Sequence, residues 1–145
     1  MDSLRIETGE KRIAINDDPA RVIVFNPQDV TFAEKFYSLI GEFEIKLNEY
    51  KAQSDQLEKV TALDANGLPV NLDARLALQR EVCTFIRNRI DYLFGANTSR
   101  IAFGDVMSMD VFEQFFQGIT PYFQKARAAK VEQYSSKTYT KKGAK

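Results

Sequence analysis

The sequence contains no histidine, no tryptophan and only one cysteine, Cys83, in 145 residues. A lone cysteine cannot close an internal disulfide, and without histidine neither a Cys/His zinc site nor a Ser-His-Asp or Cys-His catalytic arrangement can be built. Imidazole acid–base catalysis is excluded for the same reason. Cys83 falls on an apolar helical face, where a free thiol packs as a small hydrophobic group. We therefore expect neither an enzyme nor a cofactor.

Nucleotide-cradling motifs and long apolar runs are missing as well. Neither Gly-x-Gly-x-x-Gly nor Gly-Lys-Ser/Thr occurs in the sequence. Residues 1–12 lack the apolar core of a secretion signal, and no apolar run approaches the roughly 18 residues that span a bilayer. We therefore expect no membrane association and a location in the cytoplasm of the cell that makes the protein.

The formal net charge is zero, but the charges are distributed unevenly. From Lys125 onward seven basic residues stand against Glu132 alone, which gives that segment +6 and leaves −6 on residues 1–124. We interpret residues 135–145 as a disordered basic tail that follows a single domain, residues 1–134. Nucleic-acid binding through this tail is disfavoured, because the rest of the chain is acidic.

Apolar alternation in residues 1–25 predicts a small antiparallel β element of about three strands. Residues 4–6 alternate with polar neighbours, a turn at residues 8–10 follows, and residues 13–15 resume the alternation. The run RVIVF at 21–25 suits a third strand. The cluster Asn-Asp-Asp-Pro at 16–19 predicts a turn and not a metal site, because no third carboxylate is tied to it by spacing.

Residues 26–134 are expected to be helical, which makes the fold class α+β with helix predominating. Asn26 as N-cap and Pro27 at the first helical position begin a helix of about 30 residues. Its apolar residues recur every three to four positions as far as Leu57.

A second helix is expected after a loop, capped by Asn71 or Asp73 and followed by Gly95 at a C-cap position. The stretch FGANTSRIAFGD, residues 94–105, comes next. Its glycines and its Asn-Thr-Ser run favour a hinge between helices over a ligand-binding loop. Within it, residues 101–103 are expected to form a short strand or a turn.

A last helix, capped by Ser108, carries the densest aromatic run in the sequence. Residues 115–117 (FFQ) are echoed seven positions later by residues 122–124 (YFQ). Pro121 either kinks this helix or breaks it in two, so the domain has three or four amphipathic helices. Either the aromatic excess fills a phenylalanine-rich core, or this helix has more apolar surface than one domain can bury and presents a face for a partner or for self-association. We predict that this face consists of Phe112, Phe115, Phe116, Ile119, Tyr122 and Phe123.

Three segments resemble the small tail assembly chaperones of long-tailed phages and prophages of Gram-positive bacteria. They are INDDPARVIVFNPQDVTFAEKFY, IDYLFGANTSRIAFGD and FEQFFQGITPYFQKAR. The order of a β element, then helices, then an Ile-Asp…Phe-Gly step is also similar. The resemblance implies a cytoplasmic adaptor that binds the aggregation-prone tape-measure protein, with the major tail (tube) protein as a candidate second partner. It also implies self-association and absence from the mature virion.

Two functions of different classes stay open. The first is the chaperone, whose apolar helical faces shield the tape-measure protein during tail assembly. The alternative is a structural phage tail protein, a tube or connector component retained in the virion. That alternative calls for a large β fraction, whereas only about 20 residues here have the pattern of strands. A third hypothesis, a phage protein that contacts DNA through its basic tail, predicts salt-sensitive retention on DNA.

Overall fold

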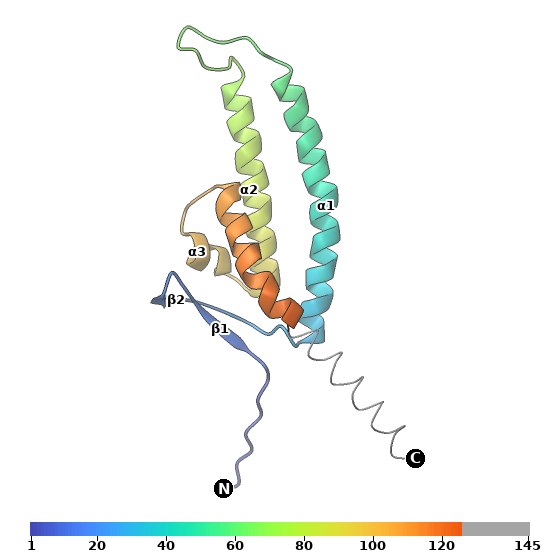
Figure 1. Cartoon of the computed structure of the whole chain (residues 1–145), viewed down its shortest axis with the longest axis vertical. Coiled ribbons are helices and arrows are strands. Elements are labelled where there is room, and N and C mark those ends of the chain that lie inside the picture. Colours follow the sequence, from blue (N-terminus) through green and yellow to red (C-terminus); the bar gives the residue numbers. More distant parts are fainter. Residues whose placement is uncertain (126–145) are drawn as a thin grey trace, which may run out of the picture.

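The computed structural model describes residues 1–125, in which a β-hairpin precedes four helices (Figure 1). The α+β fold class with helix predominating is confirmed. Helices α1 and α2 form a long antiparallel pair, and the remaining elements pack against its lower half (Figure 1). The elements are β1 (Lys11–Ile15), β2 (Asp18–Phe25), α1 (Val30–Glu58), α2 (Leu72–Phe94), α3 (Thr98–Phe103) and a C-terminal helix, residues 109–125.

The sheet of the described residues has two strands, so the expectation of about three is wrong. The hairpin turn lies at Asn16 and Asp17, whose φ angles of 54° and 59° match a two-residue type I′ turn. Residues 1–10 form no strand, and Leu4 and Ile6 are exposed. The physical reason is that alternation makes a strand only where a partner strand is available, and β2 pairs with β1 no further than Phe25.

Strand β2 fixes the hairpin to the helices. Ile23 and Phe25 alternate toward the core and are buried there. Arg21, on the same strand, donates from Nε to the Ile101 carbonyl at 2.9 Å and from Nη2 to the Ala102 carbonyl at 2.8 Å. Both carbonyls lie in the last turn of α3, where no further amide of the helix is available to donate to them. Arg21 therefore links the sheet to α3 by supplying the missing hydrogen-bond donors.

Helix α1 has 29 residues, as the apolar periodicity predicts, but Asn26 is not its N-cap. The cap is Asp29, whose Oδ1 accepts a hydrogen bond from the Thr31 amide at 2.9 Å. The Asn26 side chain has other partners, since its Oδ1 accepts from the Gln28 amide and its Nδ2 donates to the Thr8 carbonyl. Asn26 is therefore bonded within a local turn, and the helix begins after Asp29, whose side chain caps it.

The far end of the helix pair is held by a polar clasp, which we define as Asn71 and Arg75. Asn71 occupies the N-cap position of α2, but its side chain makes no cap hydrogen bond to that helix. Its Nδ2 donates instead to the Leu57 carbonyl at 2.8 Å, and Arg75 donates to the Val60 carbonyl at 2.9 Å. The clasp satisfies backbone carbonyls at the end of α1 with side chains of α2.

The stretch after α2 is a hinge, as its residue types predict. Gly95 is the C-cap of α2 and has a φ of 115°. Its amide donates to the Asp91 carbonyl in the last turn of that helix. The Asp91 carboxylate accepts from the Ser99 amide at 2.8 Å and from Ser99 Oγ at 3.0 Å. Residues 101–103 belong to α3, so the expectation of a strand or turn there is wrong. The carboxylate of Asp91 satisfies donors in the first turn of α3, which allows so short a helix to form.

The C-terminal helix begins after Ser108, whose Oγ accepts from the Asp110 amide at 3.2 Å, so the predicted cap is confirmed. The helix runs without interruption through Pro121 as far as the description extends, and the alternative that Pro121 breaks it is wrong. Thr120 Oγ1 donates to the Phe116 carbonyl at 2.6 Å just before the proline. The predicted tail, residues 135–145, and the predicted helical residues 126–134 lie outside the described residues.

The apolar core is confined to one half of the helix pair. On α1 its last buried residue is Leu39, and on α2 its first is Cys83. No residue from 40 to 82 is buried. We call residues 44–82 the distal arm and the rest of residues 11–125 the proximal half. The proximal core is rich in phenylalanine. The ring of Phe32, for example, contacts four others, those of Phe25, Phe36, Phe94 and Phe123.

Candidate functional site

The structure divides the six predicted partner-binding residues of the C-terminal helix between the core and the surface. Phe112, Phe115, Ile119 and Phe123 are buried in the core. Phe116 is half-buried, and Tyr122 is 44% exposed. In this conformation the surface of the protein therefore offers only Phe116 and Tyr122, of these six, to a partner.

Phe116 lies in the wall of an apolar groove between the C-terminal helix and α1, which we call the lower groove. Its volume is about 550 Å³. None of the described residues that line it is charged. They are Phe36, Tyr37, Leu39, Ile40, Phe43, Phe116, Thr120, Phe123 and Gln124.

The α1 wall of the lower groove follows from helical spacing. Phe36, Ile40 and Phe43 stand three and four positions apart, so their side chains share one face of α1. The Phe36 ring lies 4.6 Å from that of Phe123, and the Phe43 ring lies 5.8 Å from that of Phe116. These ring contacts form the floor of the groove, while Ile40 stays 46% exposed at its edge.

A second hollow, the upper groove, lies beyond the start of the C-terminal helix and has a volume of about 610 Å³. Helix α1 supplies one side of it and α2 the other, and residues 107–110 close its lower end. It is mostly apolar but contains two charged side chains, Lys51 and Asp110. Its remaining lining residues are Leu47, Tyr50, Ser54, Leu78, Gln79, Val82, Cys83, Met107, Ser108 and Met109.

Groups suited to catalysis are scarce around these grooves. Within residues 1–125 no cluster of three or more His, Cys, Asp or Glu side chains is placed to hold a metal ion. Burial raises the pKa of the Cys83 thiol above its ordinary value, although the nearby Arg80 and Arg87 charges oppose the shift. A thiol that keeps its proton is a poor nucleophile. What the site offers is apolar surface.

None of the described helices is apolar over enough of its length to cross a membrane.

The described residues form a small α+β protein whose apolar surface hollows lie along one long helix. A sequence model of one protein family matches residues 21–145, which is most of the chain. The protein belongs to this family, whose description is a family of unknown function (DUF6673). No curated protein and no solved structure matches the chain. The resemblance to tail assembly chaperones therefore stays a prediction.

Proposed function

We propose that this protein is a tail assembly chaperone, an adaptor that binds the tape-measure protein in the host cytoplasm during phage tail morphogenesis. The observation that carries the proposal is the lower groove, an open hollow of about 550 Å³ with no charged side chain among the described residues that line it. Such a groove suits an amphipathic helix that lays its apolar face against it. The sequence resemblance supplies the identity of the client.

The exposed aromatic and aliphatic side chains around the groove support this proposal. Tyr37 and Ile40 on α1 are both substantially exposed, and both line the groove. Large apolar groups gathered at a hollow mark an interaction surface more often than isolated ones do. The major tail protein and a second copy of the chain are further partners within the same proposal.

The experiment is a co-expression pull-down of the tape-measure protein of the same phage genome with the full chain and two variants. Ile40→Asp places a carboxylate at the edge of the lower groove. Ile45→Asp is the matched control, because Ile45 is on the same helix, is 64% exposed and points away from the groove. We expect Ile40→Asp to reduce co-purification at least tenfold and Ile45→Asp to leave it unchanged, with equal helicity by circular dichroism.

Two results would contradict the proposal. If both variants retain the client as well as the original chain does, the groove is not its binding site. If the tape-measure protein does not co-purify, and mass spectrometry instead finds the chain in purified virions, the alternative of a structural tail protein replaces the chaperone.

A further inference from the structure

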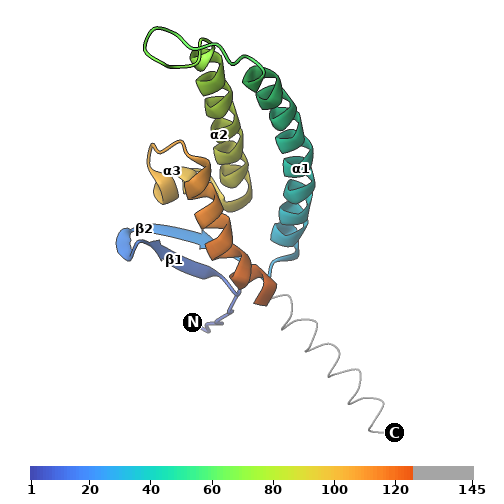
Figure 2. The same cartoon turned by 45° about the horizontal axis from the view of Figure 1, so that its top comes forward.

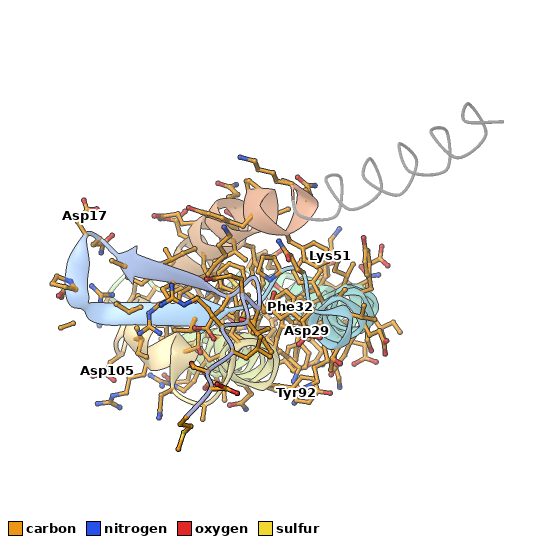
Figure 3. All side chains as sticks on the ribbon, turned by 90° about the horizontal axis from the view of Figure 1, so that it is seen from below. Asp17, Asp29, Phe32, Lys51, Tyr92 and Asp105 are labelled. Atoms are coloured by element: carbon orange, nitrogen blue, oxygen red, sulfur yellow. The ribbon has the colours of Figure 1, made fainter. Side chains whose placement is uncertain are left out.

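The two grooves lie in line along α1. Residues 36–43 of α1 line the lower groove and residues 47–54 line the upper one. The C-terminal helix contributes to both, through residues 116–124 below and through its start at 109–110 above. Figure 3, a view from below, shows Lys51 on the side of α1 that faces the C-terminal helix.

The shared wall has the spacing of a coiled-coil seam. Ile40, Leu47 and Ser54 follow one another at intervals of seven residues, with Phe43 and Tyr50 between them. From residue 36 to residue 54 this wall is about 27 Å long, at about 1.5 Å of rise per residue. That length matches about five turns of a single docked helix.

The rim of the two grooves is acidic. Glu44 stands four positions after Ile40, and Glu113 stands three before Phe116, so both carboxylates lie on the groove faces of their helices. Both are exposed, and within residues 1–125 neither makes an ion pair. Asp110 adds a third carboxylate, and among the described lining residues of either groove Lys51 is the one cation.

We infer that the two grooves form one docking site for a single amphipathic helix of the partner, with apolar residues in heptad spacing and lysine or arginine on its flanks. The apolar residues would fill the uncharged floor, where burial supplies the affinity. The basic flanks would meet Glu44 and Glu113, which sets the choice of partner more than the strength of binding. The inference rests on the proposed function in one respect, since it names the class of segment that the client presents.

The test uses two synthetic 21-residue helical peptides and the full-length protein. Both peptides carry leucine at the a and d positions, and the e and g positions hold lysine in one and glutamate in the other. Fluorescence anisotropy at low salt should show the lysine peptide binding at least tenfold more tightly. The preference should shrink as salt rises, because exposed charges are screened.

Protein variants locate the site. Glu44→Lys with Glu113→Lys should reverse the peptide preference, whereas Glu34→Lys with Glu81→Lys, which changes the net charge equally but away from the grooves, should preserve it. Leu47→Asp in the upper groove and Ile40→Asp in the lower groove should each weaken the lysine peptide at least tenfold, because one helix covers both.

Each contrary result overturns the inference. If the peptides bind equally or not at all, or if both double variants behave alike, the acidic rim does not select the partner. An effect of Ile40→Asp without one of Leu47→Asp means that the lower groove acts alone. If the protein is a dimer by sedimentation that Ile40→Asp converts to a monomer, the occupant is a second copy.

The two proposals can fail separately. Co-purification of the tape-measure protein, lost in Ile40→Asp, combined with equal binding of both peptides would leave the chaperone proposal standing and overturn the inference. If the peptides behave as expected but the tape-measure protein does not co-purify, the inference stands and the chaperone proposal is overturned.

Discussion

The two halves of the α1–α2 pair share a helical spacing of apolar residues but have different surroundings. Both halves have apolar residues at helical spacing, yet the proximal half holds the whole buried core and the distal arm holds none of it. Figure 2 shows the cause, because the β-hairpin, α3 and the C-terminal helix all lie beside the proximal half and the distal arm projects beyond them. Two helices alone cannot enclose their facing side chains, and a third element is needed to exclude water.

The halves are therefore held by different forces. In the proximal half, tightly packed phenylalanine rings such as those of Phe103 and Phe112, 5.0 Å apart, contribute by burial and by edge-to-face contact. In the distal arm, the clasp of Asn71 and Arg75 joins the helix ends through hydrogen bonds to backbone carbonyls. A region with few buried apolar contacts opens locally at lower cost, which suits an arm that adjusts to a partner.

The largest expected effect comes from truncating a ring in the proximal core. Phe112 is 2% exposed, so Phe112→Ala should lower the free energy of unfolding by about 3–5 kcal/mol. Leu57→Ala in the distal arm removes a partly exposed side chain and should cost about 1 kcal/mol or less. Urea unfolding of both variants measures the difference. Equal losses would mean that the distal arm is packed as tightly as the proximal half.

A smaller effect is expected from removing the clasp. Arg75→Ala deletes the donors to the Leu57 and Val60 carbonyls, worth about 1–2 kcal/mol, and this cost should fall on the distal arm. By hydrogen exchange, amides of residues 50–58 and 72–80 should lose about tenfold in protection while those of residues 86–94 keep theirs. Arg80→Ala, an exposed control, should change neither. Equal loss in both segments would show that the two halves open as one unit.

The sequence predicts the helices well because their signals are local. The periodicity of α1, the glycine after α2 and the hydroxyl of Ser108 each act within a few residues, and each appears where it is expected. The strand expected at residues 4–6 fails because a strand depends on a distant partner. The cap at Asn26 fails because its side chain is bonded to Thr8, eighteen positions earlier.

The candidate site is harder to predict, because core and interaction surface have the same residue types. Along the C-terminal helix, Phe115 and Phe116 are neighbours in sequence, yet Phe115 is buried in the core and Phe116 forms a groove wall. The Phe115 ring packs against those of Phe94 and Phe103, whereas the Phe116 ring packs against Phe43 of α1. On α1 itself, Ile40 belongs to the same apolar stripe as buried Phe36, and its exposure follows from how far the C-terminal helix covers that stripe.

The smallest effect concerns Cys83, which marks the border between the halves as the first buried residue of α2. Burial raises the pKa of its thiol above the ordinary value, so the folded state keeps the proton to higher pH than the unfolded state does. The contribution of the thiol to stability is therefore fully present below the pKa of the unfolded thiol and is lost as pH rises through the folded pKa. The free energy of unfolding should fall more steeply above pH 9 for the original chain than for Cys83→Ala. Because tyrosines and lysines titrate in both proteins, the comparison isolates the thiol. Parallel slopes would mean that water reaches the Cys83 thiol as it reaches the side chains of the distal arm. The buried core would then begin further along α2, nearer to the hinge that follows this helix.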